Sequence, residues 1–235
     1  GMLSFFFLPV NSWAQCGGGG GTLSVVNPSF EGPQDPHVTP APWNNCLNGQ
    51  TPDTQPGNWG ITQPPTDGTS YLGLVNTHCQ NWREGASQEL SAPMTAGTQY
   101  SFTIDLSNPG AAGGGIDGGC IELQVWGGWN DCDMTELLWS SGVLTSNTPW
   151  TTYTVTFTPS ANYSHISLIS HIPNNSCTPC GDNPYIMVDN MGPIQPNVGL
   201  NITSPASSDT VGCSFLVTGT NKCPTDSIVL SGNFN

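Results

Sequence analysis

Apolar and polar residues alternate with a period of two along most of this chain, and that pattern confines it to β structure. Residues 151–158 are the clearest case, because Tyr153, Val155 and Phe157 fall on one face of a strand and threonines on the other. No window repeats apolar residues at the spacing of an ordinary helix. Similar alternation marks residues 23–26, 70–75, 86–90, 99–106, 120–126, 137–141, 165–172 and 185–188. So many short strands between Gly, Pro and Asn turns predict an all-β fold, a jelly-roll β-sandwich.

The charge balance narrows the range of partners. The 235 residues include two Lys or Arg and 16 Asp or Glu, which gives a formal net charge of -14. A chain without a basic patch cannot release counterions from phosphates, which argues against nucleic acid and anionic membranes as partners. Neutral extracellular ligands, cations and glycan surfaces stay open. Eight Trp, eight Phe and five Tyr indicate a packed core rather than a disordered chain.

The cysteine content indicates where the protein works. Nine cysteines are typical of an oxidising compartment, so we expect a secreted or cell-surface protein. Residues 4–15 look like the apolar part of a secretory signal without its basic start, and they are too short to span a bilayer. A buried N-terminal strand is the alternative. Cys16 could carry a lipid or leave with the signal, and we assign residues 1–21 to a signal remnant and a Gly-rich spacer.

We place the jelly roll at residues 22–195, and the pattern of the sequence changes after its last strand. Shorter strand-like runs follow, and they predict the start of an Ig-like β module over residues 196–235. These runs are residues 198–202, 214–218 and 227–230. The alternative is a C-terminal extension that packs on the jelly roll.

Two stretches inside the jelly roll lack strand signals. Residues 32–69 carry many prolines, and residues 111–119 are rich in glycine. A loop as long as the first is usually functional or held down by a covalent link. Cys46 lies within it and is a candidate for that link.

Two acidic residues end short apolar runs near the two ends of the predicted jelly roll. Glu31 follows residues 25–30, and Asp189 follows residues 185–188. If the first and last strands lie side by side in one sheet, the two carboxylates come close together with almost no basic residue nearby. Calcium prefers six to eight oxygen ligands of this kind, so the pair predicts a structural Ca²⁺. The alternative is that Glu31 caps a turn and Asp189 accepts backbone N–H bonds.

A series of short motifs occurs in order along the chain. They are NPSFE (27–31), TPDTQPG (51–57), WG (59–60), PTDGTSYLGL (65–74), SQEL (87–90), AGTQY (96–100), WTTY (150–153) and VDN (188–190). Over residues 22–195 the series resembles galactose-binding-like jelly rolls, in particular family 4/9/22 carbohydrate-binding modules. It also resembles domains of secreted Bacteroidetes surface proteins, which precede Ig-like repeats. The resemblance implies a structural calcium held by Glu31, Asp189 and backbone carbonyls near Asn27.

A sugar-binding face needs aromatic rings for stacking and polar groups for the hydroxyls. Alternation over residues 120–126 places Glu122, Gln124 and Trp126 on one side of a strand, which makes a plausible ligand face. Trp129 follows in a glycine-rich turn, and Trp43 and Trp82 are further candidates. The alternative is that these aromatic residues cover sheet edges and loops.

The cysteines are more suited to structural than to reactive roles. We expect one disulfide between Cys120 and Cys132 and another between Cys213 and Cys223, because each pair brackets a short turn. Cys46, Cys79, Cys177 and Cys180 allow three pairings. We favour Cys46 with Cys177 or Cys180, and among these the Cys46–Cys180 bond, which would tie the long loop to the last strand.

These patterns predict a non-catalytic extracellular module that binds a glycan or another neutral surface ligand. The alternative is a structural or adhesive bead that neighbours Ig-like modules in a large cell-surface protein and binds no small molecule. No nucleophile, zinc or phosphate-loop motif occurs in the chain. Several acids are available for catalysis, among them Glu84, Glu89 and Glu136. An enzyme would show two carboxylates in one cleft with perturbed protonation.

Overall fold

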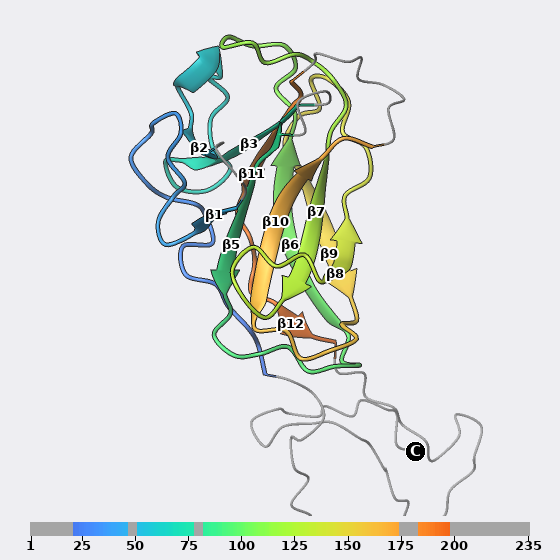
Figure 1. Ribbon diagram of the computed structural model, residues 1–235. Helices are drawn as coiled ribbons and strands as arrows, with labels where there is room; N and C mark the ends of the chain where they lie inside the picture. Colours follow the sequence, from blue (N-terminus) through green and yellow to red (C-terminus); the bar gives the residue numbers. More distant parts are fainter. Residues whose placement is uncertain (1–20, 47–50, 78–81, 174–182, 198–235) are drawn as a thin grey trace, which may run out of the picture. The chain divides into compact units, whose positions relative to one another are not determined.

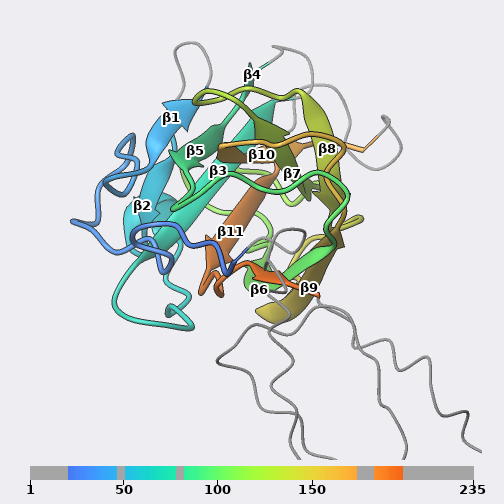
Figure 2. The same cartoon turned by 90° about the horizontal axis from the view of Figure 1, so that it is seen from below.

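The protein is a sandwich of two antiparallel β-sheets with the character of a jelly roll (Figure 1). The computed structural model describes residues 21–46, 51–77, 82–173 and 183–197. Seen from below, the two sheets lie as layers one over the other (Figure 2). The short 3-10 turn η1 (Asn58–Gly60) is the helical element of the described part, which contains no helix that could cross a membrane.

Five strands form the first sheet, in the order β1-β5-β10-β7-β8. They are β1 (Asn44–Cys46), β5 (Gly85–Glu89), β10 (His165–His171), β7 (Glu122–Gly128) and β8 (Glu136–Ser140). At the centre of this sheet Ser167 of β10 pairs with Ser87 of β5 on one side and with Trp126 of β7 on the other.

Seven strands form the second sheet, in the order β12-β6-β11-β3-β2, with β9 paired to β6 and β4 paired to β3. They are β12 (Gln195–Pro196), β6 (Tyr100–Ser107), β11 (Tyr185–Asp189), β3 (Tyr71–Thr77), β2 (Asp53–Gln55), β9 (Thr151–Phe157) and β4 (Trp82–Arg83). Because β11 lies between β6 and β3, Asp189 stands opposite Asp105 in the middle of the sheet.

The hydrophobic core fills the space between the sheets and follows the alternation of the sequence. On β9, Val155 and Phe157 are buried while the threonines between them are exposed. On β11, Ile186 and Val188 face the core, and Tyr185 and Met187 belong to a second cluster on the other face of the sheet. Residues of two loops, Trp59 and Ile61 in one and Ala112 and Ile116 in the other, cover the second cluster.

The structure bears differently on the predicted first strand, the predicted signal remnant and the predicted Ig-like module. Residues 23–26 do not form the expected first strand: Leu23 makes an isolated bridge to Ile194, and β11 pairs with β3 and β6 instead. The predicted signal remnant lies outside the described residues except for residue 21, and the predicted Ig-like module lies outside them except for residues 196 and 197. The Cys213–Cys223 pairing therefore falls outside the described part as well.

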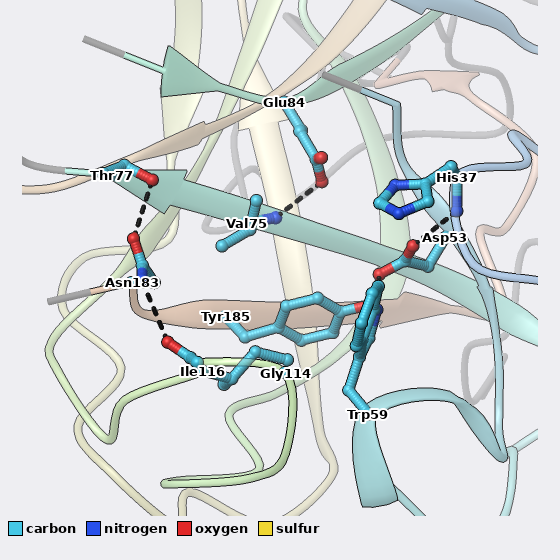
Figure 3. A pocket seen from close by; sticks show the side chains of 11 residues that line it. His37, Asp53, Trp59, Val75, Thr77, Glu84, Gly114, Ile116, Asn183 and Tyr185 are labelled. Carbon is cyan, nitrogen blue, oxygen red and sulfur yellow. Dashed lines mark hydrogen bonds between the residues drawn. The ribbon is translucent and has the colours of Figure 1, made fainter. Parts of the chain in front are cut away.

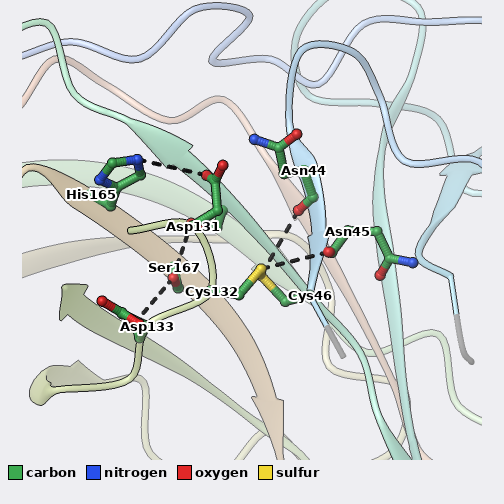
Figure 4. The surroundings of a disulfide bond; sticks show 9 residues. Asn44, Asn45, Cys46, Asp131, Cys132, Asp133, His165 and Ser167 are labelled. Carbon is green, nitrogen blue, oxygen red and sulfur yellow. Dashed lines mark hydrogen bonds and ion pairs between the residues drawn. A yellow bond between two sulfur atoms is a disulfide. The ribbon is translucent and has the colours of Figure 1, made fainter. Parts of the chain in front are cut away.

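The disulfide pairing differs from the prediction. Cys46 at the end of β1 is bonded to Cys132 in the turn after β7, across a sequence separation of 86 residues (Figure 4). This bond excludes both the expected Cys120–Cys132 bridge and a Cys46–Cys180 bridge, and Cys120 is disulfide-bonded elsewhere. The prediction relied on spacing along the chain and was wrong, because β1 and the β7–β8 turn are brought together by the pairing of both with β5 and β10 in one sheet. Cys46 does hold the long loop, as expected, but ties it to a different element.

We expect the Cys46–Cys132 bond to restrain the long loop of residues 32–69. The double variant Cys46→Ser, Cys132→Ser should lose about 2–5 kcal/mol of unfolding free energy, because a long closed loop is released in the unfolded chain. Urea unfolding measures the loss, and limited proteolysis should cut within residues 32–69 first. The double variant is preferable to reduction, because reduction would also break the bond of Cys120. Unchanged stability together with cuts spread evenly over the chain would contradict the expectation.

Candidate functional site

A cavity in the described part of the protein lies on the outer face of the second sheet, where β2, β3 and β11 form its floor (Figure 3). Its volume is about 150 Å³, about that of an engineered apolar cavity that takes up benzene. Two carboxyl groups, three aromatic rings and a glycine-rich loop meet there. The lining residues are His37, Asp53, Trp59, Val75, Thr77, Glu84, Gly114, Gly115, Ile116, Asn183 and Tyr185.

Asp53 organises one side of the cavity through three hydrogen bonds. Its Oδ1 accepts the backbone N–H of His37 at 2.8 Å. Its Oδ2 accepts the indole N–H of Trp59 at 2.7 Å and the hydroxyl of Tyr185 at 2.8 Å. Asp53 is 4% exposed, and the three hydrogen bonds satisfy the oxygens of this buried side chain. The three donors come from the long loop, from η1 and from β11, so one carboxylate fixes three walls.

Tyr185 reaches Asp53 because β3 has no side chain in its path. A Cβ atom at Gly73 would collide with the hydroxyl and ring of Tyr185, so only glycine fits at this position. The hydroxyl also accepts the side-chain amide of Gln55 at 3.0 Å. Burial, and the neighbouring charge of Asp53, raise the pKa of Tyr185 well above its usual value. The phenol is therefore a neutral donor that points across the cavity floor.

Glu84 enters the cavity from the opposite side, between β4 and β5 (Figure 3). It is 3% exposed, and its carboxyl Oε2 accepts the backbone N–H of Val75 at 2.8 Å. Burial, with a contribution from the charge of Asp53, raises the pKa of Glu84 to about 9, against an ordinary value of 4.5. A carboxylic acid that keeps its proton at neutral pH is suited to donate it to a bound molecule.

The remaining wall is formed by contact between two loops. The backbone N–H of Gly113 donates to the carbonyl of Trp59, and a Cβ atom at Gly114 would collide with the indole ring. Asn183 fixes the glycine-rich loop, since it donates to the carbonyl of Gly115 at 2.9 Å and accepts the Thr77 hydroxyl at 2.8 Å. The two loops that lack strand signals in the sequence therefore build the mouth of the cavity.

The residues of the predicted ligand face lie on the other sheet, away from this cavity. Glu122, Gln124 and Trp126 share one face of β7, but they bond to one another. The Trp126 indole donates to Gln124 at 3.1 Å, Gln124 donates to Glu122 at 3.0 Å, and Glu122 lies 3.7 Å from the ring nitrogen of His171. Most of their polar capacity is therefore used internally.

The other predicted ligand residues are scattered. Trp43 is 4% exposed, stacks on Phe30 in the core and donates to the Asn27 carbonyl, so it presents no open face. Trp129 is 52% exposed and rests on the ring of Tyr163. Trp82 is part of β4, and its side chain lies outside what the structure describes.

The predicted calcium ligands lie at the two ends of one turn. Asp189 Oδ2 accepts the N–H groups of Thr66 and Asp67 at 2.7 and 3.1 Å, and Glu31 accepts those of Thr69 and Ser70. The Asn27 side chain bonds to the backbone of Glu31. These contacts match the alternative in which Glu31 caps a turn and Asp189 accepts backbone N–H bonds, and carboxylate oxygens that accept such bonds keep further lone pairs. Among the described residues no group of three or more His, Cys, Asp or Glu could hold a metal ion.

Comparison with known proteins changes the expected function. The model of the HpiC1-like family, described as HpiC1 cyclase, matches residues 21–171, and no curated protein matches the chain. This match overturns two predictions, that the chain is not an enzyme and that it is a non-catalytic glycan- or surface-ligand-binding module, because the family is one of cyclases. The prediction of the fold stands as a two-sheet sandwich.

Among the solved structures that match the chain, a Stig cyclase shows the same fold. The Stig cyclase Fisc from Fischerella sp. TAU, in complex with (3Z)-3-(1-methyl-2-pyrrolidinylidene)-3H-indole, is 17% identical with a TM-score of 0.50, over 75% of this chain and 98% of that chain. An apo cyclase from Fischerella sp. is 17% identical with a TM-score of 0.48, over 74% and 95%. The CBM22-1 xylan-binding domain of Paenibacillus barcinonensis Xyn10C is 12% identical with a TM-score of 0.41, over 72% and 90%.

The shifted pKa of Glu84 predicts a pH dependence of stability. Glu84 ionises near pH 4.5 in the unfolded chain but near pH 9 in the folded protein, so the unfolding free energy falls as pH rises between these values. Glu84→Gln cannot ionise, so between about pH 5 and pH 8.5 it should lose less stability than the wild type by about 2–4 kcal/mol. Urea unfolding at several pH values measures this, with Glu89→Gln on the surface of β5 as control. Parallel pH curves for all three proteins would refute a protonated Glu84.

Proposed function

The chain belongs to the HpiC1-like family, and we propose that it is a cyclase that closes a ring in a small organic substrate bound between Asp53, Glu84 and Tyr185. The observation that carries the proposal is Glu84, a buried acid that faces the cavity and holds its proton at neutral pH. A second carboxyl group, Asp53, lines the same cavity. A buried carboxylic acid that keeps its proton in a pocket is what an acid-promoted reaction requires.

The geometry assigns a role to each oxygen of Glu84. Oε2 accepts the Val75 N–H, which leaves Oε1 to carry the proton. We propose that this proton passes to a basic atom or a double bond of the substrate. The protonated substrate then lacks electrons at one carbon, and a bond forms when an electron pair elsewhere in the same molecule attacks it. Loss of a proton from the ring product completes the isomerisation and allows Glu84 to be protonated again.

The hydrogen bonds around Asp53 support this role by keeping the cavity in shape. Trp59 is fixed both by Asp53 and by the backbone of Gly113, and Tyr185 is fixed by Asp53 and Gln55. A substrate folded against such walls has fewer conformations, which brings the reacting atoms together. We propose that Asp53 acts through these neighbours as a positioning residue.

Several further expectations remain proposals. Secretion, or exposure at the cell surface, is supported by the Cys46–Cys132 disulfide, which suits an oxidising compartment. The acidic composition supports the absence of nucleic-acid partners. Neighbouring Ig-like modules and a structural calcium also stay predictions.

The cyclase proposal is tested by turnover. Purified protein is incubated with unsaturated, nitrogen-containing compounds, including indoles, the class bound by the Fischerella Stig cyclase, and chromatography with mass detection identifies ring products of unchanged mass. Glu84→Gln should lower kcat by about 10²–10⁴-fold, and the wild-type rate should fall above about pH 9 as Glu84 loses its proton. Glu89→Gln should leave both unchanged. A fully active Glu84→Gln protein would remove Glu84 from the mechanism.

The calcium prediction has its own test. If Glu31 and Asp189 share an ion, millimolar calcium should raise the unfolding free energy of the wild type, by about 2.7 kcal/mol at a concentration one hundred times Kd. Glu31→Gln should abolish that increase, while Asp131→Asn, at an exposed carboxylate, should keep it. Equal melting temperatures for the wild type in calcium and in chelator would show that the turn is held by hydrogen bonds alone.

A further inference from the structure

The carboxyl group of Asp53 lines the cavity, and no lysine or arginine of the described lining lies there to pair with it. Asp53 accepts its three hydrogen bonds from a backbone amide, an indole and a phenol, and none of these groups is charged. These bonds stabilise the carboxylate but do not neutralise it. None of the described residues that line the cavity is a lysine or arginine. The second acid, Glu84, stays protonated partly because of the Asp53 charge, so the two groups sense each other across the cavity.

Aromatic faces surround the same space. Trp59 and His37 meet edge to face with their ring centroids 5.4 Å apart, and Tyr185 lies across the floor (Figure 3). Aromatic rings attract cations through the negative potential of their faces, and indole does so most strongly. His37 and Gly114 are exposed, so the cavity opens to solvent beside these rings.

We propose that this cavity selects an organic cation, meaning a substrate or intermediate that carries positive charge on a nitrogen or carbon atom next to Asp53. As a statement about the substrate class, the inference rests on the proposed function. As a statement about charge selectivity it stands on the carboxylate, the rings and the absence of basic residues from the described lining. A neutral molecule of the same shape gains the apolar contacts but not the electrostatic ones.

Charge selectivity and the protonation of Glu84 are linked. Among the described residues that line the cavity, the titratable groups that face Glu84 are Asp53 on β2, Tyr185 on β11 and His37 in the long loop. A bound cation stabilises the ionised form of Glu84, and ionised Glu84 in turn binds the cation more strongly. The affinity for a permanent cation therefore rises as pH approaches 9, whereas the affinity for a neutral molecule follows the opposite course or stays constant.

The test uses two probes of the same shape, choline and 3,3-dimethylbutan-1-ol, which differ in a positive nitrogen and a neutral carbon. Titrations followed by NMR give both dissociation constants for the wild type. We expect choline to bind at least about fivefold more tightly at pH 7, and the ratio to increase toward pH 9. Asp53→Asn should bring the ratio to about one, while Asp131→Asn, next to His165 on the first sheet, should leave it unchanged.

Glu84→Gln provides a second readout that does not depend on the folding of Asp53→Asn. It should keep the choline preference at pH 7 and lose its increase toward pH 9. Equal affinities of the wild type for both probes, no binding of either probe, or a ratio insensitive to Asp53→Asn in a folded protein would each overturn the inference. No turnover is involved, so an inactive protein that prefers choline would refute the cyclisation alone, and a turning-over protein without that preference would refute the charge selectivity alone.

Discussion

A chain with 16 acidic and two basic residues cannot neutralise its buried carboxylates with ion pairs. In the described part of the protein, the ion pairs involve histidines, His165 with Asp131 and His171 with Glu122. Buried acids are held instead by neutral donors. Although burial acts in the opposite direction, hydrogen bonds from Thr152, Thr66 and Asn190 hold the pKa of Asp105 below its usual value. Some of these donors come from loops, such as Thr66 for Asp105 and His37 for Asp53, so these two carboxyl groups help to order the loops around them.

Glu84 accepts fewer hydrogen bonds than Asp53 does. Asp53 receives three hydrogen bonds, whereas the hydrogen bond that Glu84 accepts comes from a single backbone amide, that of Val75. Burial raises the pKa of Glu84, and the single hydrogen bond from Val75 offsets that rise only in part. The acid of the proposed mechanism therefore results from burial with little hydrogen-bond support, and no basic residue or motif in the sequence is needed to produce it.

The sequence contained enough information for most of the two sheets but not for the site. Alternation placed eight strands within two residues, including β9 and the β7 face of Glu122, Gln124 and Trp126, but it did not indicate β1, β2, β4 or β12, and residues 23–26 form no strand. It also indicated that residues 32–69 and 111–119 are unusual, and these loops line the cavity. Asp53 lies in the motif of residues 51–57, to which no role in a site was assigned, and Glu84 lies in none of the motifs. The two are 31 positions apart in the chain, so their meeting depends on the pairing of β2 with β3 and of β3 with β4. The predicted disulfide pairing was wrong for the same reason, because β5 and β10 lie between β1, which carries Cys46, and β7, which Cys132 follows.

The resemblance to carbohydrate-binding modules led to the right architecture and to the wrong function, because function in a sandwich depends on side chains and loops that the framework does not determine. The framework motifs specify turns and strand pairing, which a cyclase and a sugar-binding module can share. The face of β7 that was expected to bind a ligand bonds to itself from Trp126 through Gln124 to Glu122. On the opposite sheet, Gly73 leaves room for Tyr185, and Tyr185 reaches Asp53. Gly73 on β3, which has no side chain, therefore bears more directly on the chemistry of this protein than the exposed Trp129 does.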